Sequence, residues 1–467
     1  MTSFIAKPRE LFDRFDPKYV AFKRRAANFR YPAVKMGSLL SESPEYGAGE
    51  AGIERVDEAT PRYIRITDID ENGELLPGLG MTAANVEPQY FLRDGDLLFA
   101  RSGNTVGKSY LHESGQVPYP CFYAGYMIRF RFSEKVLPKY VFAFTQTPYY
   151  HEWVSAIQRS AGQPNINAQE YRSLEIPLPP LPEQRKIVAE LDAAYAAKRA
   201  ADEKATKLLA SIDDMVLNEL GIAKLPKPDT SLSSRIFTVP AKEVLNDRFD
   251  AHYNQEFFRD LADLIREDKR CCRLGSVGTF VRGVTYKSED ESDCGHAILR
   301  ANNVSLEEFD LDLSDLVHVS SDLAFSPAQQ IKDGDILICA ASGSKEHAGK
   351  VAYVRNAPDD TYIGGFMMVL RTDAGVNPEY VAAYMQSSIF RGLIFRHLGG
   401  TNINNVSLEL LNKLPLILPD VAMQDGIALK ASSIRAEARK LKADATTALD
   451  AAKRKIESRI VERKSIV

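Results

Sequence analysis

Two long parts of the sequence repeat each other in the same order. The segment RFDPKY from Arg14 is matched by RFDAHY from Arg248, and FYAGYMIRFR from Phe122 is matched by YIGGFMMVLR from Tyr362. The offset between matching segments stays between 234 (Arg14 to Arg248) and 240 (Phe122 to Tyr362). Solenoid repeats have much shorter periods of about 20–50 residues. The sequence therefore predicts two copies of one domain, and any fold must accommodate this duplication.

Further matches fill the space between these anchors. They pair KMGSLL with RLGSVG, YIRITDID with ILRANNVS, DGDLLFARSG with DGDILICAASG, LPKYVFAFTQT with NPEYVAAYMQS, and GQPNINAQEYRSLEIPLPPL with GGTNINNVSLELLNKLPLIL. This alignment places Arg65 opposite Arg300 and Asn165 opposite Asn402.

The first part of each copy reads as β-rich. Short runs such as DLLFA, YMIRFRF, DILICA and FMMVLR are rich in β-branched and aromatic residues and are separated by Gly, Asn, Asp and Ser, a pattern typical of strands and turns. One helix is predicted in each copy, over PKYVFAFTQTPYYHEWVSAI and PEYVAAYMQSSIFRGLIF, because each run opens on a proline that suits a first helical turn.

The second part of each copy reads as one long helix. Apolar residues recur at alternating steps of four and three, with only Lys198 interrupting the first series, which is the heptad pattern of a coiled coil. The two seams are Ile187, Leu191, Ala194, Ala201, Ala205, Leu208, Ile212 and Met215, then Ile427, Ala431, Ile434, Ala438, Leu441, Ala445, Ala448 and Ala452. At 1.5 Å per residue each helix is roughly 57 Å long, and the two are expected to pair antiparallel.

The predicted fold class is α+β, with two homologous β-rich domains separated by long antiparallel coiled-coil helices in a pseudo-twofold arrangement. The predicted segments are a first domain over 1–180, a spacer helix over 181–222, a linker over 223–247, a second domain over 248–418 and a C-terminal spacer helix over 419–467.

Composition sets outer limits on function. A chain of 467 residues with 45% hydrophobic residues can bury two or three ordinary cores. Its net charge of −4 means that any nucleic-acid contact must come from local basic patches. The five cysteines form no CxxC pair, and no apolar run approaches the roughly 18 residues of a membrane span. A reduced, cytoplasmic protein without a membrane segment is expected.

The stretch ARSGNTVGKS resembles a P-loop. A P-loop requires Gly-x4-Gly-Lys-Ser/Thr between a strand and a helix, but Ser102 stands at the first glycine position and SYLHESGQVPYP does not read as a helix. The matching stretch ASGSKEHAGKV is one residue longer and has Val351 where a hydroxyl would bind magnesium. Both are therefore predicted to be turns of β-hairpins, serving either structure alone or contact with DNA.

No other catalytic or metal-binding pattern stands out. The seven histidines are dispersed without paired ligand spacing, and the nearest match to a methyltransferase Asn-Pro-Pro-Tyr loop, NPEY at Asn377, lacks the second proline. The prediction is a chain with no catalytic residue, no metal site and no cofactor of its own.

The chain resembles the specificity subunits of type I restriction-modification enzymes. The segment IPLPPLPEQRKIVAELD from Ile176 to Asp192 carries most of the resemblance, supported by GQPNIN, RFDAHYNQEF and GDLLFARSGNTVGK. The second junction, LPLILPDVAMQDGIALK, departs from the family pattern: it lacks the Pro-Pro pair and the Glu, and Gln424 stands two places late against Gln184.

The resemblance implies a non-catalytic DNA reader. Each recognition domain would read one half of a split, asymmetric site in double-stranded DNA, and the spacer helices would dock two methyltransferase subunits. S-adenosylmethionine, ATP and Mg²⁺ would then belong to the methyltransferase and restriction subunits of the complex.

Base readout uses Arg, Lys, Asn and Gln at loop tips. The candidate DNA-binding residues are Arg65, Arg101, Asn104, Lys108, Asn165, Arg300, Lys345, Lys350 and Asn402, and the candidate partner-binding residues are Gln184, Ile187, Leu191, Ile427 and Ile434. A structural role remains about as plausible for each candidate DNA-binding residue. A coiled-coil scaffold that never touches DNA is the alternative function, and a P-loop enzyme is the third.

Overall fold

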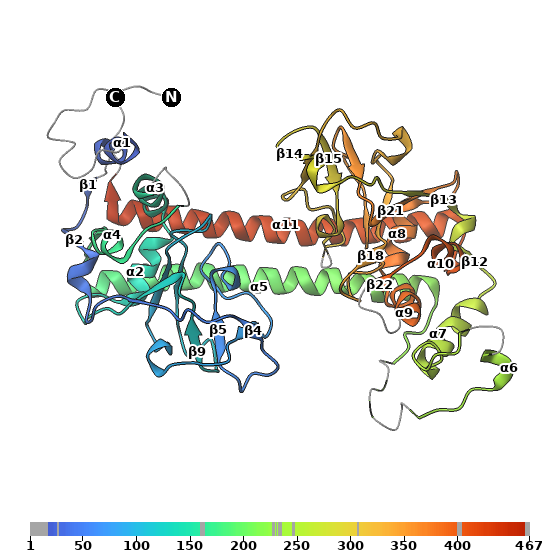
Figure 1. Cartoon of the computed structure of the whole chain (residues 1–467), viewed down its shortest axis with the longest axis horizontal. Coiled ribbons are helices and arrows are strands. Elements are labelled where there is room, and N and C mark those ends of the chain that lie inside the picture. The colour runs from blue at the N-terminus through green and yellow to red at the C-terminus, as the bar shows by residue number, and fades with distance from the viewer. Residues whose placement is uncertain are drawn as a thin grey trace. The chain divides into compact units, whose positions relative to one another are not determined.

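The computed structural model describes residues 17–462 apart from 26–27, 159–163, 227–228, 230, 232–235, 245–247, 306–307 and 399–403. The chain divides into two compact units (Figure 1). Unit 1 comprises Met1–Ala200 with Ala443–Val467, and unit 2 comprises Ala201–Lys442. Each unit thus combines one repeat with one end of each long helix.

The two units contain the same sheets. In unit 1, one sheet has the order β3 (Glu45–Tyr46), β10 (Met127–Phe130), β7 (Leu97–Ala100) and β8 (Ser109–Leu111), and a second has the order β4 (Ile53–Glu54), β6 (Met81–Thr82), β5 (Arg62–Ile64) and β9 (Cys121–Tyr123). In unit 2, the matching orders are β13 (Gly278–Arg282), β21 (Met367–Thr372), β17 (Ile336–Cys339) and β19 (Val351–Tyr353), and β14 (Glu291–Ser292), β16 (Val317–Val319), β15 (His296–Leu299) and β20 (Thr361–Ile363). Even the one parallel pair of each second sheet recurs, β5 with β9 and β15 with β20. The predicted duplication is confirmed.

Each unit also contains two separate two-stranded sheets. In unit 1, β1 (Asn28–Phe29) pairs with β24 (Val461–Glu462), and β2 (Ala33–Lys35) pairs with β11 (Glu175–Pro177). In unit 2, β12 (Cys271–Arg273) pairs with β23 (Pro415–Ile417), and β18 (Ala341–Ser342) pairs with β22 (Asn404–Asn405).

The single helix predicted in each copy is in fact two helices. These are α2 (Pro138–Thr145) and α3 (Pro148–Ile157) in unit 1, and α8 (Pro378–Gln386) and α9 (Ser388–His397) in unit 2. The hydroxyls of Thr147 and Ser387 accept hydrogen bonds from the amides of Tyr150 and Phe390 and so cap the second helix of each pair. A capping hydroxyl satisfies an otherwise unpaired amide and starts a new helix, which explains the break.

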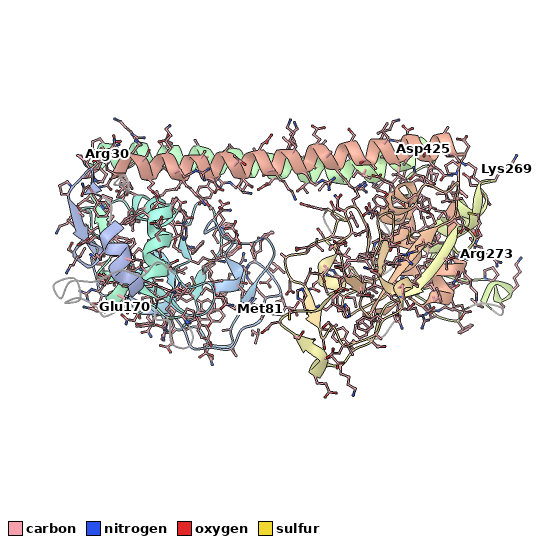
Figure 2. The ribbon with its side chains drawn as sticks, turned by 90° about the horizontal axis from the view of Figure 1, so that it is seen from above. Arg30, Met81, Glu170, Lys269, Arg273 and Asp425 are labelled. Carbon is pink, nitrogen blue, oxygen red and sulfur yellow. The ribbon has the colours of Figure 1, made fainter. Side chains whose placement is uncertain are left out.

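Each unit also contains smaller helices. They are α1 (Pro17–Arg25) and α4 (Ala168–Arg172) in unit 1, and α7 (Glu256–Arg266) and α10 (Leu408–Lys413) in unit 2, with the four-residue α6 (Ala241–Val244) preceding α7. Of these, α1 contacts α3 and α7 contacts α9. Glu170, labelled in Figure 2, closes the first turn of α4 by accepting from the Asn167 amide while Asn167 Oδ1 accepts from the Glu170 amide.

The long helices are α5 (Leu181–Leu220) and α11 (Val421–Ile460), each of 40 residues. In unit 1, Ile187 and Leu191 near the start of α5 share a buried core with Ile456 near the end of α11. In unit 2, Ile212 near the end of α5 shares a core with Ile427 near the start of α11. The two helices therefore run antiparallel within each unit.

Charged pairs flank both helix contacts. In unit 1, Arg459 Nη1 lies 2.7 Å from Glu190, and Arg459 also pairs with Glu183. In unit 2, Lys430 Nζ lies 2.6 Å from Glu219.

Each long helix is joined to its own domain by a buried glutamine. Gln184 Nε2 donates to Pro179 O at 2.9 Å and its Oε1 accepts from Leu137 N at 2.9 Å. Gln424 makes the same two bonds, to Pro419 O at 2.8 Å and from Asn377 N at 2.9 Å. Gln424 therefore occupies the position equivalent to Gln184, and the two-place offset inferred from the sequence is wrong. Next to it, Asp425 (Figure 2) accepts a hydrogen bond from Asn377 Nδ2 at 2.7 Å.

Candidate nucleic-acid interface

The P-loop-like stretch is the turn of a β-hairpin. Strands β7 and β8 pair antiparallel with Phe99 opposite Ser109, and β17 and β19 pair in the same way. Gly107 has φ of +91°, and a Cβ there would lie 2.5 Å from Val154 Cγ1. The glycine is thus required by backbone conformation and close packing. The predicted hairpin is confirmed, and since no helix follows the loop, a phosphate cradle has no structural basis.

The lysine after that glycine holds the domain together. Lys108 Nζ donates to Ile69 O at 2.8 Å, and Lys350 Nζ donates to Val304 O at 2.6 Å. Lys350 is only 2% exposed, and this burial lowers the pKa of its ammonium group. In both units the side chain links the hairpin to a distant turn. The prediction that Lys350 contacts DNA is therefore corrected, because its buried ammonium group is directed to the protein backbone. For the half-buried Lys108, contact with DNA stays a prediction.

Arg65 and Arg300 occupy equivalent turns and have acidic neighbours. Arg65 forms a two-pronged ion pair with Asp68, with Nη2 at 2.9 Å from Oδ1 and Nε at 3.1 Å from Oδ2. These hydrogen bonds raise the pKa of Arg65. Arg300 Nη2 lies 3.4 Å from Asp315 Oδ2. Both guanidinium groups are partly neutralised, which weakens the case for them as DNA ligands without testing it.

The structure corrects the pairing of the asparagine-rich segments. Asn165 forms an isolated antiparallel β-bridge with Ser102, and Ile166 N donates a hydrogen bond to Arg101 O at 2.8 Å. In unit 2, Val406 N donates to the equivalent Ala340 O at 2.7 Å, and Asn405 pairs with Ala341. Asn405 therefore stands where Asn165 stands, three residues after the Asn402 aligned from the sequence. Asn402 itself lies outside the described residues.

The remaining predicted loop residues are placed but not tested. Asn104 and Lys345 are both exposed in the two hairpin turns, as contact with a ligand would require. Their contact with DNA stays a prediction.

One predicted residue, Arg101, lies in a patch that the sequence did not reveal. We define the unit 1 patch as Tyr46, Arg101 and Tyr126. The Arg101 guanidinium lies 4.9 Å from the centre of the Tyr46 ring, and Arg101 N donates to Tyr126 O at 2.9 Å. Tyr46 is opposite Ile128 in the β3–β10 ladder, so all three residues extend the same end of this sheet. Within the described part of the chain, Arg101 has no carboxylate partner.

The same place in unit 2 has a related composition. Met368 pairs with Arg282, and Ala340 N donates to Phe366 O at 2.8 Å. We define the unit 2 patch as Arg282, Ala340 and Phe366. The Arg282 guanidinium is exposed and forms no ion pair with any residue that the structure describes. In unit 1 the guanidinium of Arg101 thus lies against the Tyr46 ring, and in unit 2 Arg282 stands opposite Met368, two residues after the exposed Phe366, so the arginine is on a different strand in each unit.

Close backbone contacts fix both patches. Gly47 and Gly283 follow Tyr46 and Arg282, and a Cβ at either glycine would collide with the turn that carries the exposed aromatic ring. Tyr126 and Phe366 were not selected from the sequence. The available signal was the repeat itself, because GYM and GFM keep an aromatic residue at the same position of both copies.

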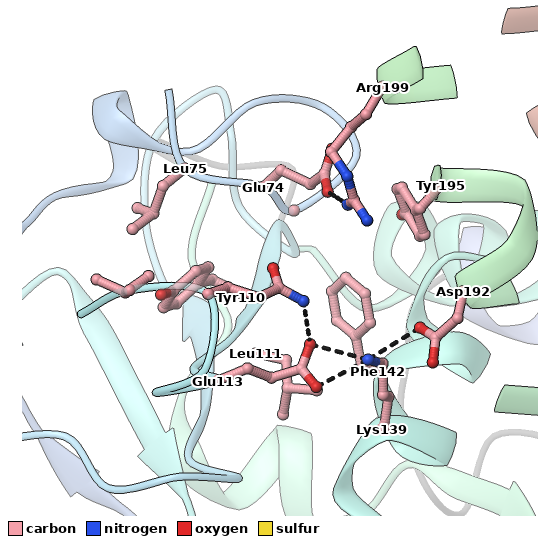
Figure 3. A pocket seen from close by; sticks show the side chains of 13 residues that line it. Glu74, Leu75, Tyr110, Leu111, Glu113, Lys139, Phe142, Asp192, Tyr195 and Arg199 are labelled. Carbon is pink, nitrogen blue, oxygen red and sulfur yellow. Dashed lines mark hydrogen bonds and ion pairs between the residues drawn. The ribbon is translucent and has the colours of Figure 1, made fainter. Parts of the chain in front are cut away.

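A polar cavity of about 440 Å³ lies in unit 1 between the β-rich part and α5 (Figure 3). Lys139 Nζ lies 2.7 Å from Glu113 and 2.9 Å from Asp192 of α5, and Arg199 of α5 pairs with Glu74. All of these charges are paired within the unit. The ion pairs that line the cavity therefore hold the start of α5 against the β-rich part of unit 1. The cavity offers no unpaired group for catalysis.

The predicted partner-binding side chains face inward. Gln184, Ile187, Leu191 and Ile427 are at most 1% exposed, and Ile434 packs against the unit 2 core. This burial leaves the four buried side chains no surface for a docking partner, so the partner assignment is corrected at these positions. Heptad periodicity finds the buried seam of a helix, whereas a partner meets its outer face.

Membrane-spanning helices and metal-binding clusters are both absent from the described residues. Within the described ranges, no helix is long and apolar enough to cross a membrane. The same residues contain no group of three or more His, Cys, Asp or Glu side chains arranged to hold a metal ion.

The family model and the curated relatives that match this chain all concern the specificity subunits of type I restriction enzymes. Residues 81–207 match the family described as the type I restriction modification DNA specificity domain. The chain is 35% identical over 174 residues to the specificity subunit of the type I restriction enzyme StySPI of Salmonella potsdam, and 33% identical over 174 residues to that of EcoKI of Escherichia coli K12. Each alignment covers 36% of this chain and 37% of the relative.

A chain from a structural study of the assembly and conformational transition of the type I restriction-modification system is also similar. It is 17% identical, with 92% of this chain and 97% of that chain covered and a TM-score of 0.44. Over about a third of its length, this chain is therefore similar to the specificity subunits of type I restriction enzymes, and the alignments span about a third of the length of these relatives.

Proposed function

We propose that the chain recognises a split DNA sequence, with unit 1 reading one half and unit 2 the other, as the specificity subunit of a type I restriction-modification complex. The observation that carries this proposal is the pair of patches. At the same end of the equivalent sheet, each unit has an exposed aromatic residue and an arginine that forms no ion pair with any described residue.

The two patches differ in the way that two different half-sites require. Arginine is the most frequent specific ligand of guanine, through O6 and N7 in the major groove. In unit 1 the arginine is Arg101, which directly follows β7. In unit 2 it is Arg282, the last residue of β13. Ala340 replaces Arg101 in unit 2. The arginine therefore meets a different part of its half-site, so an asymmetric recognition sequence follows.

Docking of methyltransferase subunits is assigned to the outer faces of the long helices. Leu429 of α11 is 73% exposed. Gly426, one turn earlier on the same helix, faces open space, because a Cβ there would meet no atom within 4 Å. On α5, Ala189 and Ala193 are exposed. Small residues permit close helix approach, and an exposed leucine is an anchor for a partner helix.

The rest of the proposal concerns the assembly. The chain itself is non-catalytic and holds no cofactor, while two methyltransferase subunits supply S-adenosylmethionine and restriction subunits supply ATP and Mg²⁺. The antiparallel helix contacts of the two units belong to one coiled coil that relates the units by a pseudo-twofold axis and fixes the gap between the half-sites. The segment boundaries predicted from the sequence and a cytoplasmic location belong to the same proposal.

The test is methylome sequencing of a host that expresses the chain with its neighbouring genes. We expect methyl-adenine in both halves of one split motif. Replacing residues 28–177, from β1 to β11, with those of a relative should change one half only, and replacing residues 271–417 should change the other. An unchanged motif after both replacements refutes sequence reading by the units. A scaffold predicts no motif and no salt-sensitive retention on DNA.

A further inference from the structure

Two exposed aromatic residues occupy the same turn in the two units. Tyr126 follows Gly125 between β9 and β10 and is 69% exposed, and Phe366 follows Gly365 between β20 and β21 and is 72% exposed. Large aromatic residues normally bury most of their surface. An exposed ring at the same site in both copies therefore needs another explanation than packing.

The neighbouring residues have clear structural reasons to recur. Met127 and Met367 are completely buried. Arg131, a few residues later, lies 2.6 Å from the buried Asp96, and its twin Arg371 lies 2.8 Å from Asp335. The fold thus accounts for the methionine and the arginine of each repeat, and it does not account for the ring.

The backbone that carries each ring is held from several sides. Tyr126 O accepts from Arg101 N at 2.9 Å, and Gly125 N donates to Ala48 O at 2.7 Å. Phe366 O accepts from both Ala340 N at 2.8 Å and Ala341 N at 3.2 Å. A ring on a fixed turn loses little conformational freedom on binding, which favours affinity.

The surroundings identify the occupant as duplex DNA. Unpaired Arg101 and Arg282 lie in the same patches as the rings and attract a polyanion. Stacked bases are the apolar component of that polyanion, and apolar side chains that enter a base step partly unstack it. A purely protein partner would not require an unpaired arginine at both positions.

Resting on the proposed function, we infer that Tyr126 and Phe366 each enter a base step of their own half-site and partly unstack it. The arginine of the same patch holds the adjacent base edge or phosphate. The two rings then act as independent wedges, one in each half of the recognition sequence.

The experiment uses the full complex of this chain with its methyltransferase subunits and the duplex defined by the methylome. The adenines of each half-site are replaced one at a time by 2-aminopurine, whose fluorescence rises when the base unstacks. We expect the wild-type complex to raise the fluorescence at one step in each half. Tyr126→Ala should abolish the rise in the half read by unit 1 only, and Phe366→Ala in the other half only.

Affinity provides the second readout. Removal of one stacked ring costs about 1–3 kcal/mol, so each alanine variant should bind the cognate duplex about 5- to 150-fold more weakly. The dependence of affinity on salt should not change, because no phosphate contact is lost. The variants Tyr126→Phe and Phe366→Tyr keep a ring and serve as matched controls that should behave like the wild type.

The outcomes separate the wedge from the proposed function. If the wild-type complex shows no sequence-specific binding, the proposed function fails. If it binds specifically but the alanine variants keep wild-type affinity and fluorescence, only the wedge is refuted. If the alanine variants no longer assemble with the methyltransferase subunits, the rings face protein, and the wedge is again refuted.

Discussion

Replacing Lys108 by methionine distinguishes a structural lysine from a DNA ligand. The Lys108 ammonium donates to Ile69 O at 2.8 Å and lies in a half-buried position of unit 1. Methionine keeps most of the length and packing of the alkyl chain but removes the donor. The Ile69 carbonyl oxygen then loses its partner.

The size of the effect follows from this hydrogen bond. A hydrogen bond to a charged group contributes about 1.5–3 kcal/mol, and partial exposure of Lys108 favours the lower end of that range. We expect a loss of about 1.5 kcal/mol in the free energy of unfolding of unit 1. At a urea dependence of about 3 kcal/mol per M, the unfolding midpoint falls by about 0.5 M.

The assay uses the only tryptophan of the sequence. Trp153 on α3 is 5% exposed within the unit 1 core, so its fluorescence reports the unfolding of that unit. Lys135→Met removes an exposed positive charge from the same unit and should leave the midpoint unchanged. In the assembled complex, Lys108→Met should leave the salt dependence of DNA affinity unchanged. An unchanged midpoint together with a weaker salt dependence would show that Lys108 binds phosphate and would refute the structural role.

Two further predictions concern buried groups of unit 1. Asp96→Ala removes the buried partner of Arg131, whose Nε lies 2.6 Å from Asp96 Oδ1, and leaves this guanidinium only the exposed Glu42 at 3.1 Å. We expect a loss of about 3 kcal/mol in urea titrations, and a loss below 1 kcal/mol would contradict the importance of this pair. Burial raises the pKa of the Cys121 thiol to about 11 from an ordinary 9.0, so iodoacetamide at pH 8 should label the exposed Cys294 and spare Cys121 until the protein unfolds, as peptide mass spectrometry can check. Because the folded protein keeps the Cys121 proton to higher pH than the unfolded chain, the contribution of this thiol to stability should fall between pH 9 and 11, and Cys121→Ser should flatten that part of the pH profile.

The sequence determined the features that depend on local pattern and on comparison of the two copies. The repeat predicted the duplication, the glycines of the loop predicted a hairpin, and the apolar periodicity predicted two long helices, all of which the structure contains. These features could be predicted because strand alternation, helical periodicity and glycine turns depend on residues that are close together in the sequence.

Tertiary structure decided which side chains remain available for function. Lys108 is bound to a carbonyl 39 residues away and Lys350 to one 46 residues away, and no local pattern reveals such a contact. The register of Asn405 was set by the β18–β22 ladder across a segment of different length in the two copies. Likewise, Arg282 became a candidate only because β13 pairs with β21, which places it opposite Met368, two residues after Phe366. Burial and long-range pairing depend on the whole fold, so no local pattern could show that the two lysines donate to distant carbonyls or that the rings of Tyr126 and Phe366 are exposed.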